Sequence, residues 1–229
     1  MIPWTGLLDG ARHGGPRIPP ALGGGFNRRG GVGHAHGIVM TMSVQPAPYR
    51  FTVDEYERMG ATGVFDPDDR LELIDGEIVI MAPIGSRHAG CVDRLNHLLF
   101  VQVGDRAVVR VQNPIRLGPR SEPQPDLALL RPRDDFYAAA HPGPADVLLV
   151  VEVADATLNY DLGAKAALYA RSGIATLWVV DLAGRGVNVL SEPTAGGFRT
   201  ATRATAGDSV AVGGLDDATV AVVDVLGPS

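Results

Sequence analysis

Lysine is almost absent from this chain. Of the 229 residues, 20 are lysine or arginine, and only one of these, Lys165, is a lysine. Arginine is a planar and permanently charged fork, whereas lysine is a compact ammonium whose pKa burial can move. Arginine serves wherever only positive charge is needed, so we expect the single lysine to mark a position that needs an ammonium group. Drift also leaves a lone lysine, so the residues around Lys165 must decide between these two interpretations.

Cysteine and long apolar runs are scarce as well. Cys91 is the single cysteine, which excludes an internal disulfide and favours a reducing, cytoplasmic location. The longest apolar runs, such as Val147 to Val151, are too short to span a bilayer. The sequence also lacks a basic segment followed by an apolar one, the pattern that directs secretion. We therefore expect a cytoplasmic protein without a membrane partner.

Positive charge is in deficit, because the formal net charge is −6. A general nucleic-acid-binding protein is usually basic, so we expect any contact with phosphate to be local or mediated by a metal. One stretch, 105–133, is richer in arginine than in acids and could follow a phosphate backbone, although a solvated arginine-rich face explains it equally well. Its charged residues are Arg106, Arg110, Arg116, Arg120, Arg131 and Arg133 against Asp105, Glu122 and Asp126.

The first 42 residues differ from the rest of the chain. They hold eleven glycines and four prolines without a helical or strand period, which predicts a disordered Gly/Pro-rich tail. Met40 or Met42 is a candidate for the true translation start, so that the tail would be a mis-assigned extension. The tail has a charge of +3, and its removal would leave −6 − 3 = −9. Residues 43–229 are predicted to form a single domain.

The domain shows clear local signals. Thr52-Val53-Asp54-Glu55 is a capping box that predicts a helix through Met59, and two alternating runs meeting at Asp75-Gly76 predict a hairpin over 70–80. The periodicity predicts helices from Ser86, with Leu95, Leu98 and Leu99 facing inward, and over 159–172, and strands at 107–112, 126–130, 146–154, 176–181 and 186–190. The last forty residues indicate two weak strands and a short apolar closing segment. This order predicts an α/β (α+β mixed) fold, with a central mixed sheet flanked by helices.

Two acids lie at the ends of predicted central strands. Glu152 follows the apolar run 147–151 and should be buried, where a carboxylate survives by pairing, neutralising or binding a metal. Asp126 follows Pro125 at the start of another strand; alone, it would be a turn aspartate. If the strands are neighbours, the two carboxylates repel each other and require a cation between them. Oxygen ligands with open positions suit Mg²⁺ (or Mn²⁺) and not zinc.

Lys165 lies on the predicted helix that follows Glu152. Asp161 precedes it by four residues and could simply support the helix through an ion pair. The face that carries Lys165 is mostly apolar, however, and should pack on the sheet, which would turn Lys165 inward. Position 154, on the same strand face as Glu152, is an alanine and leaves room for a long ammonium side chain. We therefore favour a functional site; the face is made by Leu158, Asp161, Leu162, Lys165, Leu168 and Tyr169. Tyr169, like Trp178 and Cys91, is interpreted as core packing.

These residues resemble the PD-(D/E)XK nuclease superfamily, with its final lysine displaced from position 154 to Lys165. More closely, the chain resembles the Uma2 family of restriction-type endonucleases over about 50–226. The order and spacing of the matching stretches make the signal specific. They are Glu72 to Glu77, His88, Asn113-Pro114, Pro125-Asp126, Val151-Glu152-Val153, Tyr160-Asp161 with Lys165, Tyr169-Ala170, Gly173-Ile174 and Trp178.

The resemblance implies a restriction-endonuclease-like core and a catalytic set of Asp126, Glu152 and Lys165, with the metal held by the two acids. Glu72 would be a third acid near the site, although a cross-strand ion pair with a neighbouring arginine is an equal alternative. His88 and Asp161 would contact substrate or support the ligands.

The implied activity is metal-dependent hydrolysis of phosphodiesters, in DNA more than in RNA, by a homodimer when both strands are cut. The alternatives are a nuclease-like fold kept as a non-catalytic binding or regulatory module, and hydrolysis of a small phosphoester.

Overall fold

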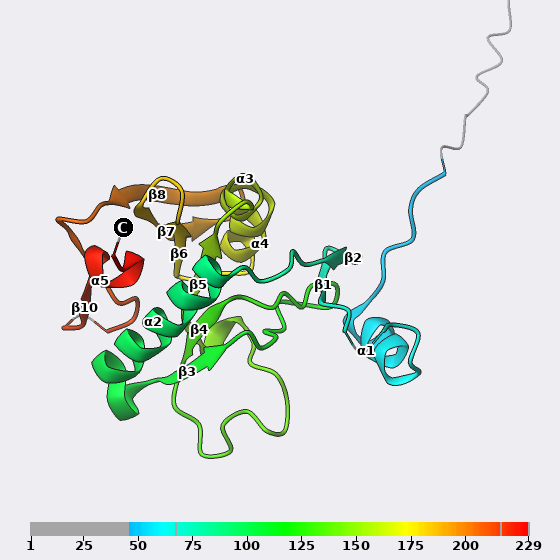
Figure 1. Cartoon of the computed structure of the whole chain (residues 1–229). Helices are drawn as coiled ribbons and strands as arrows, with labels where there is room; N and C mark the ends of the chain where they lie inside the picture. Colours follow the sequence, from blue (N-terminus) through cyan, green and yellow to red (C-terminus); the bar gives the residue numbers. More distant parts are fainter. Residues whose placement is uncertain (1–45, 67, 216, 229) are drawn as a thin grey trace, which may run out of the picture. The chain divides into compact units, whose positions relative to one another are not determined.

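The most apolar segments of the chain form the middle of the sheet. The computed structural model describes residues 46–66, 68–215 and 217–228, so the predicted tail and translation start lie outside the described residues. Strand β5 (Val147–Ala154) is buried along its whole length, as expected of a strand covered on both faces. It lies in the six-stranded order β3-β4-β5-β6-β7-β8 (Figure 1). The neighbours are β3 (Val108–Val111), β4 (Leu127–Leu130), β6 (Thr176–Asp181), β7 (Gly186–Thr194) and β8 (Gly197–Ala204).

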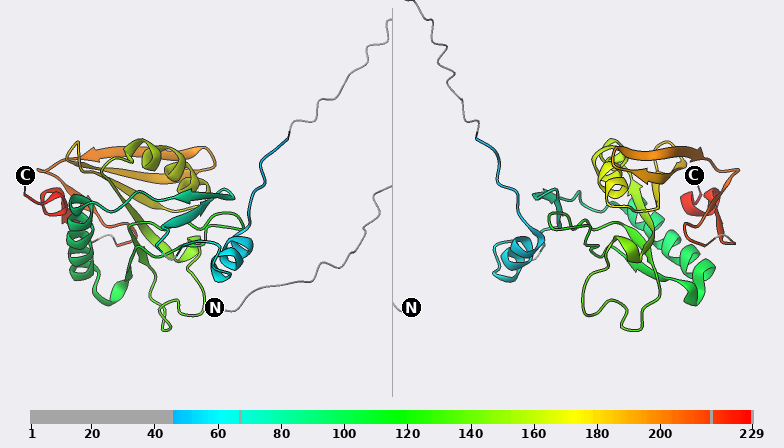
Figure 2. Two further views of the ribbon diagram at one scale, coloured as in Figure 1. Left: turned by 45° about the vertical axis from the view of Figure 1, so that its right-hand side comes forward. Right: turned by 180° about the vertical axis from the view of Figure 1, so that it is seen from behind.

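Only the β5–β6 pair is parallel among these strands, and the other neighbours are antiparallel. The predicted mixed sheet is therefore confirmed. Helix α2 (Ser86–Val103) and the short α5 (Val222–Leu226) cover one face of the sheet, and the helix over residues 158–171 covers the other (Figure 2). Apolar side chains of β5 alternate between the two cores, because successive strand residues point to opposite faces.

The segment before α2 supplies a helix and a hairpin. Helix α1 (Val53–Ala61) begins with the predicted capping box, in which Thr52 and Glu55 bond each other's backbone. Strands β1 (Leu71–Ile74) and β2 (Glu77–Ile80) form a separate antiparallel pair. Their turn residues Asp75 and Gly76 both have positive φ angles, 51° and 79°, as a two-residue type I′ turn requires. The predicted hairpin is confirmed, and it places Glu72 on β1.

The helix after β5 contains an irregular turn. It runs through α3 (Leu158–Tyr160), a π-helical turn η3 (Asp161–Lys165) and α4 (Ala166–Arg171). The wider π turn shifts the buried stripe relative to a regular helix. The prediction that Leu162 faces inward is therefore wrong: its side chain is 37% exposed, whereas Asp161 and Lys165 are buried.

The C-terminal part differs most from its prediction. Three strands replace the two weak ones: β8 extends the main sheet, and β9 (Ser209–Ala211) pairs with β10 (Thr219–Ala221) before α5. The eight-residue β8 lies at an edge and is largely exposed, so its sequence shows little of the hydrophobic alternation that marks a buried strand. Two short 3₁₀ turns, η1 (Gly104–Arg106) and η2 (Pro144–Asp146), complete the elements.

Candidate active site

The two acids named from the sequence meet at one end of the central sheet. Leu127 of β4 pairs with Val151 of β5 in antiparallel register, so Asp126, one residue earlier, comes opposite Glu152, one residue later. Residues opposite each other on adjacent strands project from the same face. Both side chains are buried, at 6% and 3% exposure. The predicted meeting of the two carboxylates is therefore present in the fold.

Asp126 is held by donors from three directions. Its Oδ2 accepts a hydrogen bond from the backbone N–H of Val153 at 2.9 Å and lies 3.0 Å from Nε2 of His88, in the first turn of α2. Its Oδ1 accepts a bond from Nε2 of Gln112 at 3.2 Å. Burial would raise the pKa of Asp126, but the bonds from His88, Val153 and Gln112 outweigh it and lower the pKa. Asp126 therefore stays ionised.

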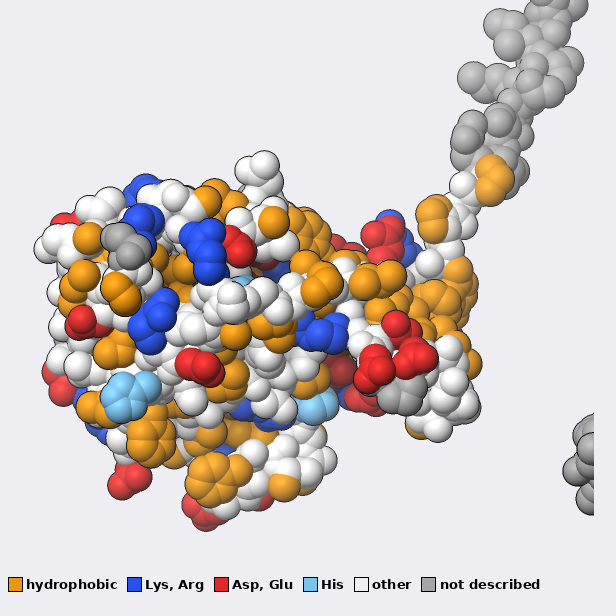
Figure 3. All heavy atoms as spheres, viewed as in Figure 1, with side chains coloured by type: hydrophobic (Ala, Val, Ile, Leu, Met, Phe, Trp, Pro, Cys, Tyr) orange, Lys and Arg blue, Asp and Glu red, His pale blue; other side chains and the backbone are white. Residues whose placement is uncertain are grey.

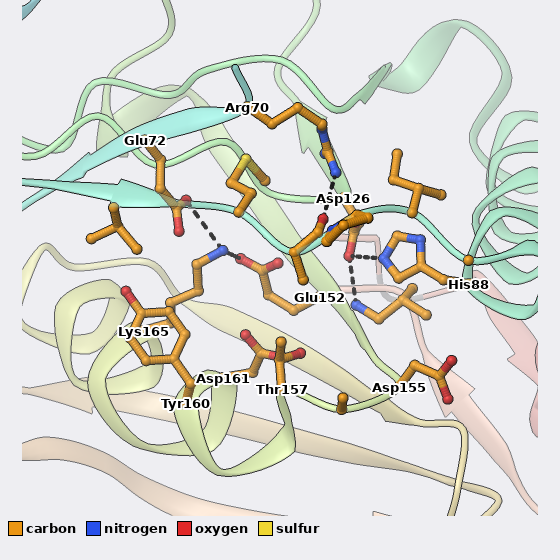
Figure 4. Close-up of a pocket in the computed structure, with 18 of the residues that line it drawn as sticks. Arg70, Glu72, His88, Asp126, Glu152, Asp155, Thr157, Tyr160, Asp161 and Lys165 are labelled. Atoms are coloured by element: carbon orange, nitrogen blue, oxygen red, sulfur yellow. Dashed lines mark hydrogen bonds and ion pairs between the residues drawn. The ribbon is translucent and has the colours of Figure 1, made fainter. Parts of the chain in front are cut away.

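Glu152 is held from the opposite side by the helix that follows its strand. Its Oε1 accepts hydrogen bonds from Nζ of Lys165 at 3.1 Å and from the hydroxyl of Tyr169 at 2.6 Å. Burial raises the pKa of Glu152 to about 8, and the nearby negative charges of Asp126, Asp161 and Glu72 add to this effect while Lys165 opposes it. Figure 4 shows Glu152 between Lys165 and Asp126.

Lys165 points inward, as predicted, and is 4% exposed. Its Nζ lies 3.1 Å from Glu152 Oε1 and 3.2 Å from Glu72 Oε2. Burial alone would lower the pKa of Lys165, but the carboxylates of Glu152, Glu72 and Asp161 outweigh it and raise the pKa. The ammonium therefore stays charged in a buried environment.

Glu72 belongs to this cluster and not to a hairpin ion pair. Its cross-strand neighbour is Val79, so the alternative of an arginine partner in the hairpin is wrong. Its carboxylate instead contacts Lys165 and accepts a bond from the backbone N–H of Gln124 at 3.2 Å. The hairpin thus carries a buried acid into a site made mostly by the main sheet.

Asp161 lines the same cavity but makes no ion pair with Lys165 within the described residues, so the simple helix-supporting interpretation does not hold. Its Oδ2 accepts a bond of 2.5 Å from the hydroxyl of Thr157. Burial raises the pKa of Asp161, against the hydrogen bond from Thr157 and the charge of Lys165. It adds a further negative charge to the wall of the cavity.

The cavity around these groups has a volume of about 600 Å³. Its polar floor is formed by the acids and Lys165 (Figure 4). The lining residues are Arg70, Glu72, Val79, Ile80, Met81, Ala82, Pro83, Ile84, Gly85, His88, Asp126, Glu152, Val153, Asp155, Ala156, Thr157, Tyr160, Asp161 and Lys165.

The donor set fits a hard divalent cation held by two carboxylates. Oε2 of Glu152 accepts no hydrogen bond from the described residues, and Oδ1 of Asp126 accepts only one. Burial, with the nearby acids, raises the pKa of Glu152, so a cation beside Glu152 would favour its charged form. Within the part of the chain that the structure describes, no three His, Cys, Asp or Glu side chains converge on a metal position. Two carboxylates with free lone pairs suit Mg²⁺, which keeps several waters and binds through one or two carboxylates plus substrate phosphate.

Two members of the site were missed or misread from the sequence. Tyr169 was interpreted as core packing, and it is fully buried, but its hydroxyl bonds Glu152. A signal existed, because Tyr169 follows Lys165 by four residues and therefore shares its helix face. Gln112, the residue after β3, has a positive φ of 49° and donates from its side chain to Asp126. No sequence pattern predicts this contact.

The arginine-rich stretch does not form a free basic track. Acids outside the stretch pair with three of its arginines: Arg106 with Asp217, Arg116 with Asp54, and Arg133 with Asp135. The face drawn in Figure 3 likewise shows basic side chains scattered among acidic and apolar ones, without a continuous stripe among the coloured residues. The local excess counted along the sequence is therefore largely cancelled by the fold.

Comparison with known proteins identifies the family of this chain. The family model of Uma2, described as "putative restriction endonuclease", matches residues 53–222, well over half of the chain. The chain belongs to the Uma2 family. Among solved structures, a "putative nuclease belonging to DUF820" from Anabaena variabilis is similar with a TM-score of 0.58 and 13% sequence identity, covering 77% of this chain and 97% of that one. At this identity the likeness shows the shared fold alone.

No curated protein matches the Uma2 chain. None of its described helices has the length and apolarity needed to cross a membrane.

Proposed function

We propose that this Uma2 protein is a divalent-metal-dependent nuclease that hydrolyses phosphodiester bonds in DNA, with Asp126 and Glu152 holding Mg²⁺ (or Mn²⁺). The observation that carries the proposal is the register of β4 and β5, which sets two carboxylates opposite each other at the floor of a cavity. The buried ammonium of Lys165 lies beside one of them. Membership of a family described as "putative restriction endonuclease" supports the same chemistry.

Each residue has a role that its contacts allow. When bound, the metal would polarise the scissile phosphate and lower the pKa of a water molecule. Lys165 carries positive charge next to the position where negative charge builds on the phosphate oxygens, an arrangement that stabilises the transition state. Glu72 and Tyr169 fix the directions of Lys165 and Glu152. His88 and Gln112 do the same for Asp126.

The test measures metal binding and cleavage together. Calorimetry with Mg²⁺ or Mn²⁺ should show binding that Asp126→Asn and Glu152→Gln abolish, and the same variants should fail to cut closed circular DNA, single- or double-stranded. Glu192→Gln, a change of an exposed acid far along β7, is the control and should keep both properties. Metal-independent cleavage, or cleavage retained by both site variants, would contradict the proposal. The proposal includes a homodimer, and light scattering would measure the mass of the assembly directly.

A non-catalytic module is the second candidate, and one observation favours it. Lys165 already pairs with both Glu72 and Glu152, so its charge could serve only to neutralise buried acids. In that case the protein would bind no metal through Asp126 and Glu152. Turnover of nucleotides without cleavage of polymers would instead indicate a small phosphoester as substrate.

A further inference from the structure

The reactive groups lie at the bottom of a cavity and not on an open surface. The side chains of Asp126, Glu152 and Lys165 are exposed by only 9%, 4% and 5%. A phosphate must therefore leave the bulk solvent and enter the cavity to reach them. The volume of about 600 Å³ lies within the range of sites that enclose one small ligand, about 300–1,000 Å³.

One wall of this cavity is an apolar segment, residues 79–85, which we call the strap. It includes the end of β2 and the link to α2, and it contributes every one of its residues to the lining. Ile80 and Ile84 are 80% and 41% exposed, among the large apolar side chains that face solvent. Exposed apolar groups gathered at the mouth of a polar cavity indicate a surface for a ligand with a flat apolar face.

The charges around the mouth do not suit a double helix. A protein that grips a duplex neutralises several phosphates with free lysine and arginine side chains. Here Arg87 lies 3.4 Å from the carboxylate of Asp155, and Arg70, which donates to the backbone oxygen of Ala82 at 3.1 Å, is the one arginine among the described residues that line the cavity. Asp161 adds a further acid to the lining of the cavity. The mouth therefore offers few contacts to a long array of phosphates.

We propose that the substrate is an unpaired segment of DNA, whose base packs against the strap while its phosphate reaches Asp126 and Glu152. This rests on the proposed nuclease function and names its substrate class. Enzymes whose reactive groups lie too deep to reach a paired strand act on single strands or on nucleotides turned out of the helix. An apolar wall suits this, because every base presents an apolar face whatever its sequence.

Three labelled DNA substrates of one sequence test the inference: a single strand, a full duplex, and a duplex with a central unpaired bubble. With Mg²⁺ we expect the single strand and the bubble to be cut at least about tenfold faster than the duplex, with cuts inside the bubble, because turning a paired base out costs a few kcal/mol. A duplex cut as fast as the single strand would overturn the inference while leaving the nuclease function intact.

Binding without metal separates this inference from the function beneath it. Fluorescence anisotropy in EDTA should show tighter binding of the single strand than of the duplex. If no DNA is cut but this preference is seen, the nuclease function fails, and what stands is that the cavity binds unpaired DNA as a ligand. Equal binding of the single strand and the duplex, without cleavage of either, would overturn the inference and the nuclease function together.

Variants of the strap provide the matched test. Ile80→Ser with Ile84→Ser removes two exposed side chains and should weaken single-strand binding about tenfold, the value of one buried aliphatic contact. Phe100→Ser removes an equally exposed apolar side chain on α2, outside the cavity, and should leave binding unchanged. Loss of binding in both variants, or in neither, argues against the strap.

Discussion

Asp126 and Glu152 face each other across adjacent strands, yet their surroundings push them in opposite directions. Asp126 accepts three hydrogen bonds and has a lowered pKa. Burial, to which the charges of nearby acids add, raises the pKa of Glu152 to about 8. A pair of carboxylates separated in this way can divide its roles, one permanently charged and one responsive to a nearby cation. We therefore expect the charge state of Glu152 to depend more strongly on its partners, Lys165 and Tyr169, than that of Asp126 does on its own.

Replacing Lys165 should have the largest effect on the Glu152 half of the site. Lys165→Ala leaves Glu72 and Glu152 buried without a counter-charge, which should cost about 3–5 kcal/mol of folding free energy. Lys165→Arg keeps the charge but replaces a compact ammonium by a longer planar fork, and we expect about 10²–10³-fold less cleavage. Thermal unfolding and Mg²⁺-dependent DNA hydrolysis measure the two effects. An arginine variant with full activity would contradict the role given to Lys165.

Tyr169→Phe should lower metal affinity at Glu152 by a smaller amount. The ring still fills the core, but Oε1 of Glu152 loses its 2.6 Å hydrogen bond, so we expect about 10–100-fold weaker metal binding. Calorimetric titration with Mn²⁺ measures this. Tyr137→Phe is the matched control, because it also removes a tyrosine hydrogen bond, to the backbone oxygen of Arg131. If both variants bind metal alike, Tyr169 has only a packing role.

His88→Ala should affect the Asp126 half least. Val153 and Gln112 still donate to Asp126 after the change, so we expect about a tenfold loss of metal affinity at most. His97→Ala, at an exposed position of the same helix α2, serves as the control. A loss from His88→Ala greater than that from Tyr169→Phe would reverse the ranking of the two halves.

Glu122 is another buried acid, and it lies outside the cavity of the candidate site. Oε2 of Glu122 is buried with no hydrogen-bond partner among the described residues, and burial raises its pKa to about 7 while Glu57 adds to the rise and Arg116 opposes it. The folded state thus holds this proton more tightly than the unfolded state. Its stabilising contribution is complete below pH 4.5, the ordinary value, and is lost as the pH rises through about 7.

Glu122→Gln should therefore remove part of the pH dependence of unfolding. We expect the variant to gain about 1 kcal/mol over the original protein at pH 8 and little at pH 4. Urea unfolding of both proteins at the two pH values gives the comparison, and cleavage should stay unchanged because Glu122 lies outside the cavity. Identical slopes of stability against pH would show that Glu122 is not the titrating group.

Much of the fold was predictable because its signals are local. The capping box at Thr52, the Asp75-Gly76 turn and the apolar run before Glu152 each fix an element with little help from the rest of the chain. The edge strand β8 was not recognised as part of the main sheet, since exposed polar residues carry little periodicity. The outward position of Leu162 depends on a π turn, which no composition or period announces.

Site residues were predictable where their residue type is unusual for its position in the sequence. They were not predictable where the same residue type is also common in a hydrophobic core. A lone lysine and a carboxylate inside an apolar run stand out in any sequence, and the structure brings both together. Tyr169 looks like any core tyrosine until its hydroxyl is placed. The pairing of Arg116 with Asp54 could not be counted along the chain, because the two residues come from separate elements.

Lys165 touches Glu72 from the hairpin and Glu152 from β5, and this has a consequence for the newly made protein. A chain still emerging from the ribosome can close its hairpin before the later helix exists. At that stage no ammonium stands beside Glu152. The cluster of Glu72, Glu152 and Lys165 is therefore complete only after the helix that follows β5 has folded.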